Sequence, residues 1–271
     1  MRGVPLLEVI DTAFPGRAAF DVAVSRAVLR EVATGKRPET LRLYRPDDVV
    51  AFSTTDLRRA GFARAVRAAH GAGFDAALRL AGGRAAVFHT ETIAFAWCTP
   101  ETDERSGIRA RFARTADWVV RALLRLGVDA RVGEVPGAYC PGDFSVNAGG
   151  RRKLMGVGQR IVRGAAHTGG VIVVGASARV REPLEPVYAA LGFEYDPAST
   201  GAVEDEVGPV SLAAVRDALL TELAGEREIR AGVLHPATLE QAARFEPSHR
   251  IPNASGHSAR SEAEPSEDRK G

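Results

Sequence analysis

The sequence predicts an α+β domain rather than a sheet with regularly alternating helices. Segments typical of strands are clustered along the chain, and helical segments lie between and after the clusters. Apolar residues make up 45% of the 271 residues and charged residues 26%, so the chain can bury a full core. We expect one domain over residues 1–245 and a disordered tail over residues 246–271, which contain almost no apolar residues.

The first half of the chain is expected to form a helix over 16–35, a strand over 41–53, a helix over 56–71 and strands over 74–83 and 84–98. The first helix has apolar residues near a helical period and a stop signal at Gly35. The sequence Arg-Pro-Asp-Asp interrupts the first strand with a turn signal. The last two strands are expected to join at Gly82-Gly83.

The second half is expected to form a helix over 109–126, a strand over 129–140, a hairpin over 143–158, two strands within 160–175 and helices over about 182–192, 211–224 and 236–245. The first of these helices has the clearest amphipathic pattern and ends at Gly127. The hairpin is predicted from Asn-Ala-Gly-Gly at 147–150, whose residues tolerate a positive φ.

Composition excludes several function classes. The net charge of +2, the 6% aromatic content and the absence of a zinc-finger or RNP-type motif predict no nucleic-acid partner. No segment approaches the roughly 20 apolar residues of a membrane span, and the N-terminal apolar run is too short for a signal peptide. We therefore expect a cytoplasmic protein whose two cysteines, Cys98 and Cys140, are free thiols. Their spacing matches no metal motif, so no metal site is predicted.

The stretch GAYCPGDFSVNAGGRRKLMGVGQR at 137–160 contains the strongest candidates for chemistry. Cys140 lies before Pro-Gly, where a strand gives way to a turn, and a nucleophile or a small core residue is an equally good interpretation. Cys98 ends an apolar run, which favours the core. Lys153 is one of three lysines in an arginine-rich chain, although Lys36 persists without an evident role and a solvated lysine is the ordinary alternative.

A neighbouring ammonium lowers the pKa of a thiol and can stabilise an oxyanion. With a turn centred on Ala148-Gly149, Lys153 would lie opposite about Phe144, four residues from Cys140. Weaker candidates are Gly82-Gly83-Arg84, where a ligand could approach the backbone or an ordinary turn could form, and the possible proton carriers His89 and His167. No P-loop is present, so the residues themselves do not indicate nucleotide binding.

Two blocks resemble the lipoate–protein ligase and octanoyltransferase superfamily: RLAGGRAAVFH at 79–89, and YCPGDFSVNAGGRRKLMGVGQRIVRGAAHTGG at 139–170. The Tyr-Cys-Pro-Gly sequence is similar to the cysteine-dependent branch, which moves octanoyl groups from the glycine-cleavage H-protein to other proteins. The resemblance implies an α+β fold with a mixed central β-sheet and flanking helices, shared with biotin–protein ligases. It also implies a single catalytic domain.

By this resemblance, Cys140 is the acyl-accepting nucleophile and Lys153 holds the substrate carbonyl. The residues implied in substrate binding are Arg79, Gly82, Gly83, Arg84, Gly156 and His167. The implied reaction moves an octanoyl or lipoyl group through a Cys140 thioester to a lysine of a lipoyl domain or H-protein. The donor would be the H-protein or an acyl carrier protein, and no cofactor would be needed.

Two alternatives remain open at this point. An ATP-dependent lipoate–protein ligase would form a lipoyl-adenylate and would not need the cysteine; ATP is a cofactor only in this alternative. A carrier-binding homologue without catalytic activity is the other, because Ala81 stands where the family usually has Ser or Thr. His89 is also one residue farther from the glycines than the corresponding histidine of the ligases, so we assign it no role by resemblance.

Overall fold

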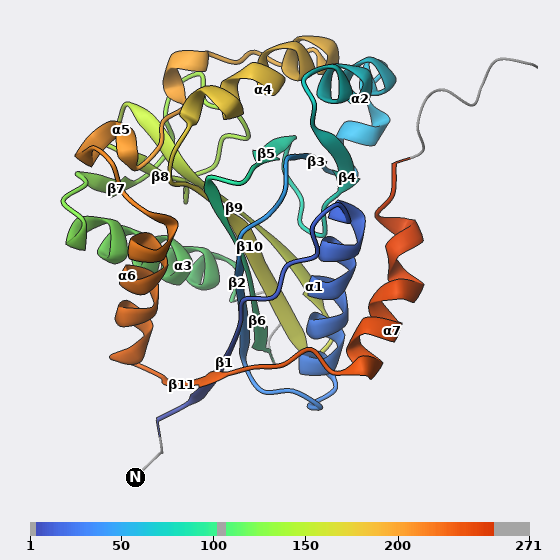
Figure 1. Ribbon diagram of the computed structural model, residues 1–271, viewed down its shortest axis with the longest axis vertical. Coiled ribbons are helices and arrows are strands. Elements are labelled where there is room, and N and C mark those ends of the chain that lie inside the picture. The colour runs from blue at the N-terminus through green and yellow to red at the C-terminus, as the bar shows by residue number, and fades with distance from the viewer. Residues whose placement is uncertain (1–3, 102–106, 252–271) are drawn as a thin grey trace, which may run out of the picture.

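The computed structural model describes residues 4–101 and 107–251. Its main sheet has eight strands in the spatial order β11-β1-β2-β6-β10-β9-β8-β7 (Figure 1). These strands span Glu228–Ala231, Leu6–Ile10, Thr40–Tyr44, Thr92–Pro100, Ala165–Val173, Arg152–Val162, Val146–Ala148 and Ala130–Val132, in that order. The strands β11, β1 and β2 are parallel and the remaining neighbours antiparallel. The predicted mixed sheet and α+β class are therefore confirmed.

A second sheet of three strands lies beside one face of the first, in the order β4-β3-β5. The strands are β3 (Val49–Phe52), β4 (Asp75–Leu78) and β5 (Ala86–Phe88). Because β3 lies between β4 and β5, the glycines at 82–83 do not close the simple strand pair predicted from the sequence. The predicted strand over 84–98 is likewise two strands, β5 and β6, which belong to different sheets and are separated by a turn at His89–Thr92.

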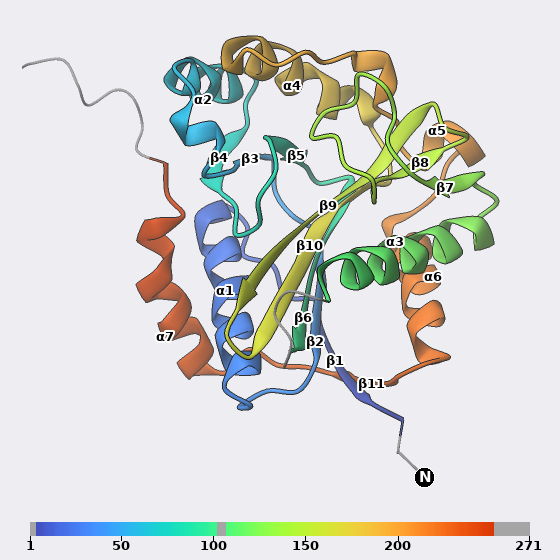
Figure 2. The same cartoon turned by 180° about the vertical axis from the view of Figure 1, so that it is seen from behind.

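Helices cover both faces of the main sheet. The helices are α1 (Ala18–Ala33), α2 (Phe62–Gly71), α3 (Ile108–Arg125), α4 (Ser177–Leu191), α5 (Glu204–Val207), α6 (Leu212–Ala224) and α7 (Pro236–Phe245). Helices α3 and α6 pack on one face, α1 and α7 lie together on the other, and α2 and α4 cover the small sheet (Figures 1 and 2). The helix expected from about 182 begins earlier, at Ser177.

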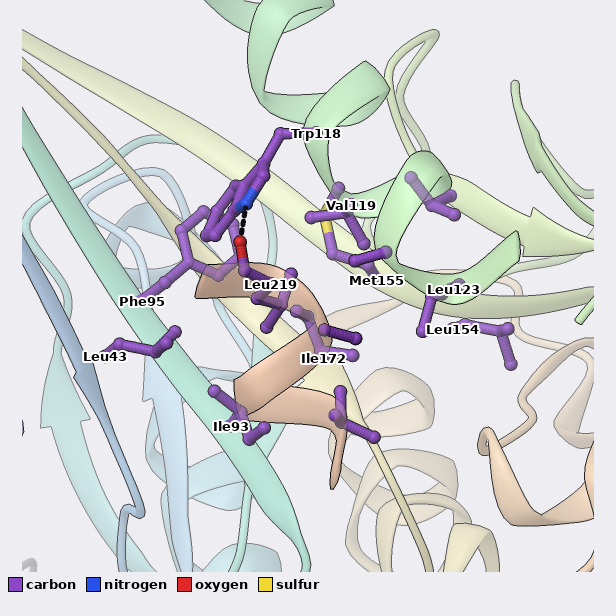
Figure 3. Packing of buried hydrophobic residues seen from close by; sticks show 14 of the residues in the cluster. Leu43, Ile93, Phe95, Trp118, Val119, Leu123, Leu154, Met155, Ile172 and Leu219 are labelled. Carbon is purple, nitrogen blue, oxygen red and sulfur yellow. Dashed lines mark hydrogen bonds between the residues drawn. The ribbon is translucent and has the colours of Figure 1, made fainter. Parts of the chain in front are cut away.

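The largest core cluster lies between the main sheet and the α3–α6 pair. Alternate residues of β2 and β6, such as Leu43 and Phe95, point into it because side chains of a strand alternate between faces. Trp118 of α3 packs edge-on against Phe95 and donates its indole N–H to the carbonyl of Leu219 in α6, at 2.9 Å (Figure 3). This bond satisfies the buried indole and fixes one helix against the other.

Strands β1 and β11, the end of the strand predicted over 129–140 and the start of the predicted tail also differ from the sequence-based expectations; the predicted strand ends at Val132. Strands β1 and β11 were not predicted; β11 is short and mostly exposed at the sheet edge. The predicted tail begins too early, because Glu246 is buried and paired with Arg17 and Arg250. The chain thus stays packed through residue 251, and the disorder predicted for 252–271 lies outside the described residues.

Candidate active site

Cys140 lies in the loop between β7 and β8 in a left-handed conformation, with a φ of 41°. Two groups hold this loop. The hydroxyl of Tyr188 in α4 accepts a hydrogen bond from the Cys140 N–H at 2.7 Å and donates one to the carbonyl of Ala85 at 2.9 Å. Tyr188 is fully buried, and its two hydrogen bonds tie the cysteine loop to the glycine-containing segment before β5. The left-handed backbone is unusual for a residue with a side chain and persists where its surroundings enforce it.

The sulfur of Cys140 faces two donors from the segment 79–84. The backbone N–H of Arg84 donates to Sγ at 3.2 Å, and Nη2 of Arg79 lies at 3.5 Å from Sγ. Gly83 has a φ of 108°, and a Cβ there would lie 2.9 Å from the sulfur and 2.3 Å from Arg79. Glycine is therefore required at 83 both for the backbone conformation and for the approach of the thiol.

Lys153 of β9 is 1% exposed and lies beneath the cysteine loop. Its Nζ donates to the carbonyl of Cys140 at 2.6 Å and to that of Tyr139 at 3.0 Å, and it lies 4.7 Å from the centre of the Tyr139 ring. The structure thus brings the predicted cysteine and lysine together. Their direct contact is through the carbonyl of Cys140 rather than its sulfur.

The strand register behind this contact differs from the predicted one. The turn uses Gly149 and Gly150, both with positive φ, and the strand before it has a register shift between Val146 and Asn147. Lys153 therefore pairs with Asn147 rather than with Phe144. The lysine still reaches residue 140 because the loop bends back over β9, and Gly156 leaves room for the stem: a Cβ there would lie 3.3 Å from Cε of Lys153.

The charges around the thiol favour its thiolate form. Burial, the largest single effect, raises the pKa of Cys140, but Arg79, Lys153 and the Arg84 N–H together outweigh it and leave the pKa below its usual value. Burial lowers the pKa of Lys153 to about 8, against the opposing effect of Cys140. A nucleophile with a lowered pKa beside an amine that titrates near neutral pH is suited to acyl transfer. By contrast, burial raises the pKa of the fully buried Cys98 to about 12.

A cavity of about 730 Å³ opens over the thiol. Gly82, Gly83 and Cys140 line one side. Phe112 and Phe144, whose rings stack with centroids 5.4 Å apart, line another. We call this the thiol cavity. It combines apolar walls with a few polar groups, as small-molecule sites commonly do.

A smaller cavity of about 60 Å³ lies deeper in the molecule, and we call it the inner cavity. Arg79, Leu80, Ala81 and His167 line it, so Arg79 belongs to the inner cavity and also contacts the thiol. His167 is 5% exposed, and burial lowers its pKa to about 4. Its Nδ1 is buried without a hydrogen-bond partner, so a polar group of a ligand could bind there.

Of the remaining predicted residues, Arg84 lies at the site and His89 does not. The backbone of Arg84 contacts the sulfur, while its guanidinium stacks over Phe193 at 4.3 Å from the ring centre. His89 is fully buried, burial lowers its pKa to about 4, and it lines neither cavity. No pattern in the sequence indicated Tyr188, which lies 48 residues beyond Cys140 in a helix that contains two prolines.

Among residues 4–101 and 107–251, no group of three or more His, Cys, Asp or Glu side chains is placed to hold a metal ion. The helices in the same ranges include none that is both long and apolar enough to cross a membrane.

Comparisons with known proteins agree with the resemblance found in the sequence. The model of the lipoyl protein ligase A/B catalytic domain matches residues 17–224. An octanoyl-[GcvH]:protein N-octanoyltransferase from Geobacillus kaustophilus is 24% identical over 210 residues, covering 78% of this chain and 72% of that protein. A protein of the same name from Exiguobacterium sibiricum is 27% identical over 190 residues, covering 69% and 67%.

Solved structures show the same fold. A lipoate-protein ligase A bound with ATP superposes with a TM-score of 0.76 at 22% identity, covering 89% of this chain and 94% of that one. The putative lipoate protein ligase Ta0514 from T. acidophilum, with bound lipoic acid, gives a TM-score of 0.71 at 22% identity, covering 90% and 95%. Since the family model spans more than half of the chain and includes the cysteine, the lysine and both glycines, this chain belongs to the lipoyl protein ligase A/B catalytic domain family.

Proposed function

We propose that this protein is an octanoyltransferase that carries the acyl group on Cys140. The single observation that carries this proposal is the environment of the Cys140 sulfur. It faces a cavity of about 730 Å³, accepts a hydrogen bond from the Arg84 N–H and lies within 3.5 Å of Arg79. A ligase that activates its acid with ATP has no need of such a thiol. The names of the curated relatives, octanoyl-[GcvH]:protein N-octanoyltransferase, support the same reaction.

The donor in this proposal is an octanoylated H-protein, and the acceptor is a lysine of a lipoyl domain. In the first step the Cys140 thiolate attacks the acyl carbonyl, a C–S bond forms, and the bond from that carbon to the donor lysine breaks. The departing amine takes a proton from Lys153. In the second step the acceptor amine attacks the thioester, the C–S bond breaks to restore the thiolate, and the proton returns to Lys153. A pKa of about 8 lets Lys153 act in both directions near neutral pH.

Lys153 also suits the role of holding the oxyanion. An ammonium has three hydrogens, and two are used on the carbonyls of Tyr139 and Cys140. In the first step the third is available to the substrate carbonyl before it passes to the departing amine, together with the Arg84 N–H that now faces the sulfur. Donors fixed before the reaction stabilise the developing charge without reorganising.

We place the acyl chain in the inner cavity, which would have to widen beyond its present volume of about 60 Å³ to take eight carbons. Phe88 and Phe95 line the inner cavity together with Leu80 and Ala81 and supply apolar walls. Each buried methylene contributes about 0.8 kcal/mol, so a well-filled tunnel can select for chain length by several kcal/mol. Arg79 lines the inner cavity and lies 3.5 Å from the sulfur, so the chain would pass this arginine with its carbonyl at the sulfur. No cofactor enters this scheme.

The test is an acyl-enzyme assay with an octanoylated H-protein as donor. Intact-mass spectrometry should detect a hydroxylamine-labile octanoyl adduct on the wild type and on Cys98→Ala, which removes only the fully buried thiol. Cys140→Ala should form no adduct and transfer no acyl group, and Lys153→Met should transfer far more slowly.

Three results would contradict the proposal. Normal acyl transfer by Cys140→Ala would show that the reaction does not pass through a thioester on Cys140. Release of pyrophosphate from ATP and lipoate by Cys140→Ala would indicate a ligase. Binding of a lipoyl domain by the wild type with no adduct from any octanoylated donor would indicate a carrier-binding protein without catalysis.

A further inference from the structure

A third cavity, of about 480 Å³, lies between α1, the far end of β9 and the chain after α7. These elements lie next to one another at the side of the molecule where β9 reaches α1 (Figure 2). Arg26 and Arg30 of α1, Arg160 of β9 and His249 line it, and we call it the arginine groove. Arg160 also lines the thiol cavity, so the two cavities adjoin.

The groove concentrates positive charge without counter-charge. Among the ion pairs of the described ranges, none includes Arg26, Arg30 or Arg160. Arg26 is fixed by a 2.8 Å hydrogen bond to Ser248 Oγ and lies 4.2 Å from the ring centre of Phe245. Burial, and then repulsion from Arg160 and Arg30, lowers the pKa of Arg26. An anion between these side chains would relieve the repulsion.

Two buried polar atoms at the same groove lack partners. His249 is 5% exposed; its Nδ1 hydrogen-bonds to the carbonyl of Leu78 at 2.8 Å, while Nε2 has no partner. Arg79 also lines the groove, and its Nε is buried without a partner. Buried polar atoms are almost always hydrogen-bonded, so these two indicate a missing ligand or water. The Arg79 Nε–H is a donor and suits an anion. His249 donates through Nδ1 and burial lowers its pKa, so its Nε2 is an acceptor and suits a water or an N–H or O–H of a ligand's organic part.

We propose that the arginine groove binds a phosphate ester whose organic part extends over Leu80 toward Arg79 and the thiol. Guanidinium groups present planar pairs of donors that match phosphate oxygens, and four arginines line this groove. Leu29, Leu80 and Phe245 supply apolar surface beside them for the organic part. A concave site of this volume suits a small phosphorylated ligand better than the flat surface of a protein.

Two sources share this chemistry: a phosphopantetheine arm, as in coenzyme A or on a carrier protein, and a free polyphosphate. Calorimetry with coenzyme A and with inorganic pyrophosphate distinguishes them. Tighter binding of coenzyme A shows that the organic part adds to the phosphate contacts, and equal or weaker affinity assigns the phosphate alone. Both results support a phosphate site, whereas binding of neither compound overturns it.

Matched variants locate the binding. Arg30→Gln/Arg160→Gln removes two exposed guanidinium groups for which no hydrogen bond or ion pair is present within the described chain, so folding should be unaffected. Arg64→Gln/Arg67→Gln makes the same charge change on the exposed face of α2, outside the groove. We expect affinity for coenzyme A to fall on the order of tenfold or more per guanidinium in the first variant and to stay unchanged in the second. An equal loss in both would reduce the effect to net charge and overturn the proposal.

The phosphate site does not depend on acyl transfer. Cys140→Ala should bind coenzyme A as the wild type does, and failure of the thioester mechanism would leave this result intact. Conversely, the enzyme could transfer acyl groups from octanoylated protein donors and bind neither phosphate compound. That result would leave the proposed transferase function standing and would refute the proposed phosphate site.

Discussion

The backbone of Cys140 offers a sharp test of how the site is built. Its φ of 41° places a residue with a side chain in the left-handed region, which costs about 1–2 kcal/mol. Glycine carries no such cost there. At an ordinary position, however, glycine is less favourable than alanine by about 0.5–1 kcal/mol. The sign of the difference in unfolding free energy between Cys140→Gly and Cys140→Ala therefore reports whether the backbone at residue 140 is left-handed.

We expect Cys140→Gly to be more stable than Cys140→Ala by about 1 kcal/mol, with acyl transfer abolished in both. Urea unfolding followed by the fluorescence of the buried Trp97 and Trp118 measures this difference. With m-values of about 1–3 kcal/mol/M, the midpoint should differ by roughly 0.3–1 M. Ala176, at a φ of 49°, is the matched control: Ala176→Gly should also stabilise.

Ala138, two residues before the cysteine, is buried and is not among the residues with positive φ, so Ala138→Gly should destabilise. If Cys140→Ala is as stable as Cys140→Gly or more stable, the reasoning is refuted. The cysteine would then not be held in a strained backbone, and the role assigned to the hydroxyl of Tyr188 would lose its basis.

Three further predictions concern the site. Arg79→Gln should raise the pKa of Cys140 and move the pH profile of iodoacetamide alkylation upward, whereas Arg84→Gln, which keeps the backbone donor, should shift it less; equal shifts would contradict the geometry. Tyr188→Phe leaves two buried backbone groups unpaired at about 1–3 kcal/mol each, so calorimetry should show a melting temperature lower by several degrees. Since burial lowers the pKa of His167 from 6.5 to about 4, the unfolded state binds more protons between these pH values, and stability should fall as the pH drops through this window. The loss at this residue should be about 3 kcal/mol, and His167→Gln should show a correspondingly shallower decline in urea midpoint.

Local patterns in the sequence determined most of the helices and the hairpin. The helix over 109–126 and the turn at 147–150 were predicted because apolar periodicity and glycine act over a few residues. The same local information indicated Cys140 and Lys153 as partners. The small sheet could not be predicted, since β3 pairs with β4 and β5 through contacts that no local pattern encodes.

What the tertiary structure decided is how these residues act on one another. It placed Lys153 on the carbonyl of Cys140 rather than the sulfur, assigned that sulfur to Arg79 and the Arg84 N–H, and added Tyr188 as the group that holds the loop. It also gathered arginines from α1 and β9 at one groove. The sequence alone determined which chemical groups were present. Their distances and pKa values depend on burial and on neighbours far apart in the chain, and only folding sets these.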